Sequence, residues 1–207
     1  MRLLFFLFCA FAVLSCPREP SHKEVLEPSK PRAHKAINPL LVSDHLMHEA
    51  KSYVKGKGFN TSVALLCDLQ IRSGSRRFFV VDLNKNSILL AGMVTHGHCQ
   101  EYLSNTIRFS NTSGSNCSSL GHFKIGGKYS GRFGTAYKLH GLDTTNSNAF
   151  NRFIVLHAHS CVPDYENVFG ICKSEGCPTV SPYFLKQLEP IIDGSNTPIL
   201  LWLYYGK

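Results

Sequence analysis

Five short segments of this 207-residue chain are apolar throughout or alternate apolar with polar side chains, and they restrict the fold more than any other feature. They are rich in β-branched and aromatic residues and are separated by Gly, Asn, Ser and Asp, which is typical of strands and turns. They are TSVALLCDLQ (61–70), RRFFVVDL (76–83), SILLAGMV (87–94), RFIVLHAH (152–159) and PILLWLYY (198–205). The stretch DLNKNS between the second and third predicts a hairpin turn. The sequence therefore predicts a mainly β domain.

Two other segments have the spacing of amphipathic helices. In SDHLMHEAKSYVKGKG (43–58), apolar residues recur at helical intervals behind Ser43, a typical N-cap, and two glycines end the pattern. The second segment is SPYFLKQLEPII (181–192), near the end of the chain. We expect both helices to lie at the margins of the β domain.

The N-terminus has the pattern of a secretory signal. An initial Met-Arg precedes LLFFLFCAFAVL (3–14), an uncharged run that is too short to span a bilayer comfortably. We therefore expect residues 1–15 to be a signal peptide. The run ends in VLSC, which resembles the lipobox at which bacterial lipoproteins are cut and lipidated on the new N-terminal cysteine, here Cys16. A cut after Ala12 would instead leave a soluble secreted protein.

A proline-rich, charged segment follows. PREPSHKEVLEPSKPRAHKAINP (17–39) holds five prolines and no apolar period, so it cannot bury enough surface to offset its ordering entropy. We expect residues 16–40 to form a disordered tether and residues 41–207 to form the folded domain.

The formal net charge of +8 favours an anionic partner. An exported domain without a dense Lys/Arg stripe or interleaved exposed aromatic residues is not expected to bind nucleic acid. An acidic wall polymer or an anionic membrane surface fits better, although a solvated basic face without a specific partner is an equal alternative.

Eight cysteines are present, and six of them lie in the expected domain: Cys67, Cys99, Cys117, Cys161, Cys172 and Cys177. In an exported protein, disulfides are the default for each of them, and the sequence does not fix the pairing. Structural zinc is disfavoured because the C-x4-C pair has no second pair of comparable spacing, so no metal or cofactor is predicted. If Cys177 is a free thiol, a second cysteine must also be free, and Cys67 within the apolar VALLCDL is the natural choice.

A cysteine and two histidines form the candidate catalytic group. Cys177 lies in KSEGCPTV (173–180), while His157 and His159 end a predicted strand, so an imidazole could lie beside the thiol. A neighbouring imidazolium can lower the pKa of a thiol by several units. On composition alone, Cys177 is better interpreted as one partner of a disulfide than as a nucleophile.

The segment LHAHSCVPDYENVFGICKSEGCPTV (156–180) resembles the active-site signature of the murein L,D-transpeptidases of the YkuD type, a histidine followed at a set distance by Ser/Thr-His-Gly-Cys. Sixteen residues separate His157 from Ser174, and fourteen separate His159 from it, and both spacings fit. Three other landmarks of the branch with SxGCP in this position occur in the same order. They are FFVVDLNKNSILLAGMVTHG, FSNTSGSNCSSLGHFKI and YSGRFGTAYKLHGLD, so the resemblance covers about residues 62–205.

The resemblance implies a YkuD-like β-sandwich with peripheral helices, in which Cys177 attacks peptidoglycan tetrapeptide stems and forms a thioester acyl-enzyme. The strand context favours His157 as the base, with His159 as the alternative. The backbone N–H groups of Gly176 and Cys177 are the expected oxyanion donors. Ser174 would orient the loop or the base, or simply form a turn.

The resemblance further implies a bacterial envelope location, in the periplasm or at the cell surface, with a lipid anchor if Cys16 is modified, and carbapenems as inhibitors. His96, His140 and Glu175 are the residues that could line the substrate cleft. Glu175 replaces the histidine of Ser-His-Gly-Cys, which removes a possible hydrogen-bond donor near the substrate. Two alternatives follow: an L,D-carboxypeptidase or other thiol hydrolase of the wall, and a non-catalytic wall-binding domain with Cys177 in a disulfide.

Overall fold

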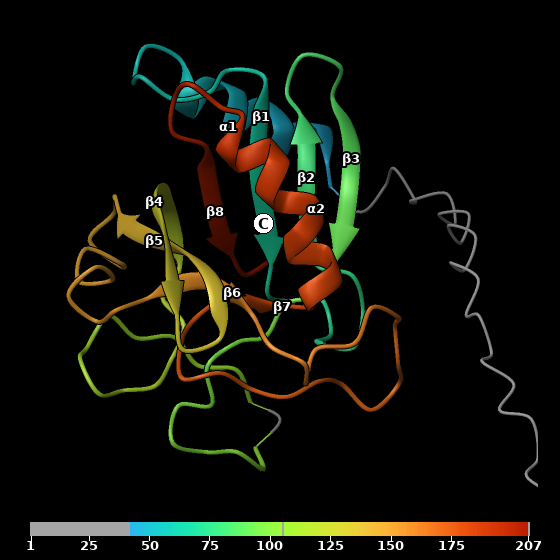
Figure 1. The fold of residues 1–207 in the computed structure, drawn as a ribbon, viewed down its shortest axis with the longest axis vertical. Helices are drawn as coiled ribbons and strands as arrows, with labels where there is room; N and C mark the ends of the chain where they lie inside the picture. The colour runs from blue at the N-terminus through green and yellow to red at the C-terminus, as the bar shows by residue number, and fades with distance from the viewer. Residues whose placement is uncertain (1–41, 105, 207) are drawn as a thin grey trace, which may run out of the picture. The chain divides into compact units, whose positions relative to one another are not determined.

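The structure is a computed structural model that describes residues 42–104 and 106–206 (Figure 1). The expected signal peptide, the lipobox that ends at Cys16 and the expected tether at 16–40 lie outside the described residues. The described residues belong to one compact unit.

Eight strands and two helices form the regular structure of the described part of the chain. In chain order they are α1 (Asp44–Val54), β1 (Val63–Asp68), β2 (Phe78–Asp82), β3 (Ser87–Gly92), β4 (Gly121–Gly131), β5 (Gly134–Gly141), β6 (Val155–Ala158), β7 (Thr179–Val180), α2 (Pro182–Asp193) and β8 (Leu200–Tyr204). The prediction of a mainly β domain is confirmed, and each of the five predicted segments contains a strand.

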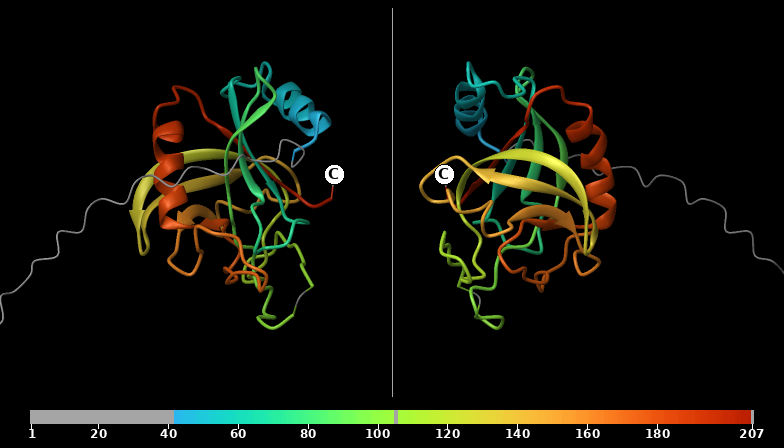
Figure 2. Two further views of the ribbon diagram at one scale, coloured as in Figure 1. Left: turned by 90° about the vertical axis from the view of Figure 1, so that its right-hand side faces the viewer. Right: turned by 60° about the vertical axis from the view of Figure 1, so that its left-hand side comes forward.

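All eight strands belong to one mixed sheet with the order β3-β2-β1-β8-β4-β5-β6-β7. The pairs β1–β8 and β6–β7 are parallel, and the other neighbours are antiparallel. The β4–β5 hairpin crosses the direction of β1–β3 (Figure 2). Side chains from both halves of the sheet, such as Phe78 and Leu139, meet in one core cluster, so the sandwich-like packing is made by one continuous sheet.

The two helices cover opposite faces of the β1–β3 half of the sheet (Figure 2). Ser43 caps α1 by accepting a hydrogen bond from the Leu46 N–H at 3.3 Å, and Ser181 caps α2 in the same way. Strand β1 therefore lies between two cores and is buried on both faces, which explains why its sequence is an unbroken apolar run.

The disulfide Cys99–Cys117 closes a loop that precedes β4 in the chain, and the disulfide Cys161–Cys172 closes a loop that follows β6. Among the described cysteines, Cys67 and Cys177 are free. This confirms the interpretation of Cys67 as a buried thiol, and burial raises its pKa to about 12. Within the same described residues, no helix is long and apolar enough to cross a membrane.

Candidate active site

A cavity of about 420 Å³ lies between the tip of the β4–β5 hairpin, strand β6 and the turn that precedes β7. Its lining includes five of the predicted site residues, namely His157, His159, Ser174, Glu175 and Cys177. The fold therefore brings the candidate thiol and both candidate bases to one hollow, although they come from different segments of the chain.

Cys177 is a half-buried free thiol. Its Sγ lies 3.8 Å from the carbonyl oxygen of Phe153, to which the S–H donates. Burial raises the pKa of Cys177, while the Val155 N–H and the positive charge of Arg152 act in the opposite direction. The resting group is thus a thiol that must lose a proton before it can attack a substrate.

The hydrogen bonds of His157 fix its tautomer. Its Nδ1 lies 3.1 Å from the carbonyl oxygen of Ala158, which can only accept, so Nδ1 carries the proton. Its Nε2 is therefore an acceptor and lies 3.0 Å from the Thr179 hydroxyl, which donates to it. Burial lowers the pKa of His157, so the ring is neutral at pH 7 and holds a basic lone pair on Nε2.

The Thr179 hydroxyl can change its partner. Besides the His157 nitrogen, Thr179 Oγ1 has the Cys177 carbonyl oxygen within reach at 3.4 Å. A hydroxyl rotates to suit its surroundings, so the bond to His157 can be exchanged for one to the carbonyl. His157 and Cys177 share the cavity without a direct hydrogen bond between them in the described structure, and this rotation would free Nε2 for the thiol.

His159 lines the same cavity but offers no free lone pair. Its Nδ1 accepts a hydrogen bond from the Cys161 backbone N–H at 3.1 Å, and a backbone N–H cannot rotate away. The neutral ring must then carry its proton on Nε2, which makes that nitrogen a donor. The two histidines are equivalent in sequence spacing but differ in the nitrogen that each can use as a base.

The cysteine turn is held by Ser174. Its Oγ donates to the Cys177 carbonyl oxygen at 2.6 Å and accepts from the Gly176 N–H at 3.2 Å. One of the two expected oxyanion donors, the Gly176 N–H, is therefore already bonded. Only the Cys177 N–H of that pair has no partner among the described residues.

Gly176 is required by the geometry of the turn. Its φ is +114°, and a Cβ at this position would lie 2.7 Å from the Cys117 carbonyl oxygen. Both the backbone conformation and the close approach exclude a larger residue. Gly176 thus supports the thiol through the shape of the turn.

Two of the three expected cleft residues lie elsewhere. His96 is buried outside the cavity, and its Nδ1 accepts from Arg77 Nη2 at 2.9 Å. Burial, with the charge of Arg77, lowers the pKa of His96 to about 4. His140 stacks on Phe150 and lines a separate hollow next to the end of α2. These placements correct the expectation for both histidines, because the bond to Arg77 holds His96 in the interior and the stack on Phe150 holds His140 at the other hollow. Glu175 does line the cavity.

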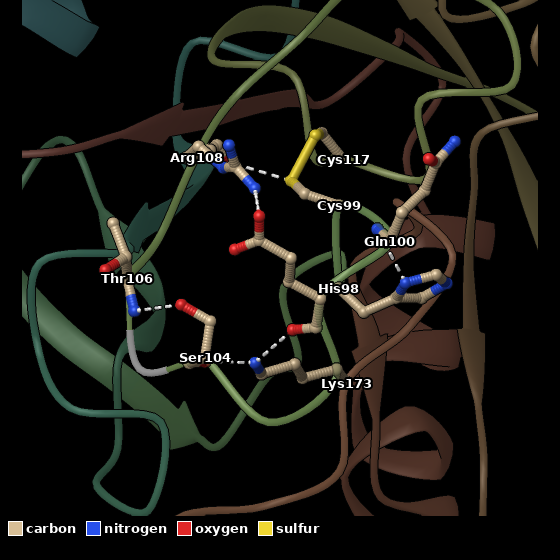
Figure 3. A network of polar contacts seen from close by, with 9 residues as sticks. His98, Cys99, Gln100, Ser104, Thr106, Arg108, Cys117 and Lys173 are labelled. Carbon is tan, nitrogen blue, oxygen red and sulfur yellow. Dashed lines mark hydrogen bonds and ion pairs between the residues drawn. A yellow bond between two sulfur atoms is a disulfide. The ribbon is translucent and has the colours of Figure 1, made fainter.

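Lys173 connects the cysteine turn to the loop closed by Cys99–Cys117 (Figure 3). Its Nζ donates to the carbonyl oxygens of Glu101 and Ser104 in that loop. Next to it, the Ser174 N–H donates to the His96 carbonyl oxygen at 2.9 Å. The turn is thus fixed to the core and to a disulfide-closed loop at the same time.

Sequence reasoning missed several residues of the site, among them Phe133, Arg152 and Thr179. Phe133 at the hairpin tip stacks on His157 with ring centroids 5.4 Å apart and meets His159 edge-on at 5.0 Å. The glycines around it in GRFG mark a hairpin tip, but nothing in the sequence signals that this tip reaches the histidines.

Within the described residues, no group of three or more His, Cys, Asp or Glu could hold a metal ion.

Comparison with known proteins identifies the family. The model of the L,D-transpeptidase catalytic domain matches residues 35–202. The chain therefore belongs to the L,D-transpeptidase catalytic domain family, which relates it to peptidoglycan transpeptidation. No curated protein matches the sequence.

Several solved structures are similar to this chain at low identity. An L,D-transpeptidase from Xylanimonas cellulosilytica DSM 15894 is 17% identical over 69% of this chain and 60% of that one, with a TM-score of 0.37. The helical cell shape determining protein Pgp2 from Campylobacter jejuni is 9% identical over 78% of this chain and 56% of that one, with a TM-score of 0.47. An L,D-transpeptidase from Mycobacterium smegmatis is 12% identical over 69% of this chain and 58% of that one, with a TM-score of 0.39. The match thus spans less than two thirds of each of these chains.

Proposed function

We propose that this protein is a cysteine-dependent L,D-transpeptidase that acts on peptidoglycan tetrapeptide stems through a thioester on Cys177. The observation that carries the proposal is a free thiol in the same cavity as a neutral histidine whose Nε2 is basic. Membership of the L,D-transpeptidase family supports the choice of substrate class.

The first half-reaction forms the acyl-enzyme. The Thr179 hydroxyl turns to the Cys177 carbonyl, His157 Nε2 takes the thiol proton, and the thiolate attacks the carbonyl carbon before the terminal D-Ala. When the tetrahedral intermediate collapses, the C–N bond breaks, and His157 returns the proton to the leaving amine of D-Ala. In the second half-reaction, an amine of another stem attacks the thioester, loses a proton to His157, and releases the thiol.

The tetrahedral oxygen needs a fixed donor, and the Cys177 N–H is the available one in the turn. Loss of one such donor typically costs about 3 kcal/mol of transition-state stabilisation. Ser174 acts indirectly in this account, because its bonds to both ends of the turn hold the Cys177 N–H in place.

The cavity is also open to water, which would release a shortened stem and make the protein an L,D-carboxypeptidase. The unpaired state of Cys177 speaks against the oxidised, non-catalytic alternative. The proposal includes export by the signal peptide, residues 1–15, to the bacterial envelope, which holds the peptidoglycan stems. It also includes lipid attachment at Cys16. A Cys16→Ser variant would then move from the membrane fraction to the soluble fraction of the envelope.

Incubation with purified tetrapeptide muropeptides tests the proposal, with Cys177→Ala as the control. Transpeptidation gives a cross-linked dimer and one D-Ala for each link. If the only product is a shortened monomer, water is the acceptor, and the protein is an L,D-carboxypeptidase instead of a transpeptidase. No product from the folded wild-type protein, or equal product from Cys177→Ala, would overturn the proposed mechanism.

Carbapenems provide an independent probe of the same thiol. We expect a carbapenem to acylate Cys177, since its strained amide offers the thiolate an electrophilic carbonyl. The intact mass of the wild-type protein should increase by the mass of the carbapenem, while Cys177→Ala stays unmodified. An unmodified wild-type mass after long exposure would argue against a reactive site.

A further inference from the structure

We propose that Arg152 is a positioning residue for Cys177: its guanidinium fixes the loop beneath the cysteine turn and holds a positive charge beside the sulfur. This inference rests on the proposed function only where it takes Cys177 to be the nucleophile. Its test uses the thiol itself and needs no peptidoglycan substrate.

The guanidinium makes four hydrogen bonds to one loop. Arg152 Nη1 donates to the Ser110 carbonyl oxygen at 2.8 Å and to Ser119 Oγ at 2.6 Å. Arg152 Nη2 donates to the Cys117 carbonyl oxygen at 2.7 Å and to Ser115 Oγ at 3.2 Å. All four acceptors are neutral, so the charge is fixed in place without being cancelled.

The same loop supports the turn that carries the thiol. The Cys117 carbonyl oxygen, which accepts from Arg152, is the atom that comes within 2.7 Å of a Cβ built on Gly176. Arg152 Nη2 itself lies 3.4 Å from that Cβ position. On the other side, Ser118 Oγ donates to the Gly176 carbonyl oxygen at 3.2 Å and accepts from the Gly97 N–H at 3.0 Å. Arg152 thus holds the support on which the turn lies.

The residues after Arg152 surround the sulfur. The Phe153 carbonyl oxygen accepts a hydrogen bond from the Cys177 S–H, and Phe153 has a φ of +57°, which a bulky residue rarely adopts. The Val155 N–H favours the thiolate. One short segment therefore presents an acceptor for the thiol, a donor for the thiolate and a fixed cation.

The positive charge of Arg152 lowers the pKa of Cys177 against the larger effect of burial, and Glu175 raises it. The other charged or titratable side chains around the cavity are Tyr129, Arg132, His157, His159 and Lys173. Removal of the Arg152 charge should therefore raise the pKa of Cys177 and leave less thiolate at neutral pH. A rise of one pKa unit lowers the thiolate fraction about tenfold.

Alkylation of Cys177 by iodoacetamide, followed from pH 6 to pH 10 by mass spectrometry, tests the inference. We expect Arg152→Met to slow alkylation at pH 7 by about three- to tenfold and to move the rise of the rate to higher pH. Arg152→Lys keeps the charge but loses the fork of donors, so we expect a profile closer to that of the wild type and a lower thermal stability. The matched control is Arg132→Met, which removes a cavity arginine without a bond to the loop.

The profile of Arg132→Met should equal that of the wild type. If Arg152→Met does not fold, Arg152→Gln replaces it, because Gln retains donors for the loop without the charge. A folded neutral variant with the wild-type profile would overturn the inference. If Arg152→Lys is alkylated as slowly as the neutral variants at each pH, the positive charge has no role in the reactivity of Cys177. Both results are readable even if the protein has no transpeptidase activity.

Discussion

Two histidines two residues apart line the same cavity, and the partner of each ring nitrogen separates them. His157 Nε2 is bonded to a hydroxyl that can rotate, whereas the acceptor nitrogen of His159 is bonded to a backbone N–H that cannot. Loss of a general base typically costs about 10²- to 10⁴-fold in rate. We therefore expect His157→Ala to lose muropeptide turnover by that factor and His159→Ala to lose less than about tenfold. The reverse ranking would transfer the role of base to His159.

His96 was a cleft candidate by sequence, but its burial against Arg77 gives it a role in stability. Its pKa falls to about 4 from an ordinary value near 6.5, so between these values the unfolded chain binds a proton that the folded protein does not. The stability that is present above pH 6.5 is therefore lost as the pH falls to about 4, by up to about 3 kcal/mol.

Urea unfolding of the wild type and of His96→Gln at pH 7 and at pH 4.5 measures this effect. Gln can still accept from Arg77 and does not titrate, so the variant should lose less stability on acidification than the wild type. His157 contributes in the same direction in both proteins, because burial lowers its pKa as well. Equal losses in the two proteins would contradict the assignment to His96.

The elements differ in how well the sequence predicts them. Strand β1 and helix α1 are read directly from apolar runs and periodicity, because each repeats one environment along its length. The long hairpin β4–β5 is not among the segments that the apolar pattern predicts as strands. A register shift between Ile125 and Lys128 interrupts the alternation of β4 at Gly126 and Gly127, so the period of two is broken where the strand bends.

The cysteine turn is the element on which the geometry of the thiol depends. We expect Gly176→Ala to destabilise the protein by about 1–3 kcal/mol, because the positive φ strains any other residue and the Cβ would meet the Cys117 carbonyl. Urea unfolding measures the loss, and Gly127→Ala in β4 is a control, since a Cβ there meets open space. A Gly176→Ala variant as stable as the control would show that the turn tolerates a side chain.

At the scale of the whole molecule, the site is assembled from segments that sequence spacing alone does not connect. The motif SEGCP and the strand that carries His157 were recognisable because each lies in a local pattern. Arg152 and Thr179 were not, since their roles arise from hydrogen bonds to a loop and to a ring that are distant in sequence. The disulfide pairing Cys99–Cys117 and Cys161–Cys172 was likewise unreadable, because several pairings satisfy the same cysteine count.

The central claim is that Cys177 becomes acylated by a stem peptide, and intact-mass measurement of the protein with a synthetic tetrapeptide stem tests it most directly. The account predicts an added mass equal to that of the tetrapeptide minus that of free D-Ala, mapped to Cys177 and absent from Cys177→Ala. A tripeptide stem, which lacks the leaving D-Ala, should give no adduct. An adduct on another residue, or no adduct on a folded protein whose Cys177 still reacts with iodoacetamide, would contradict the account.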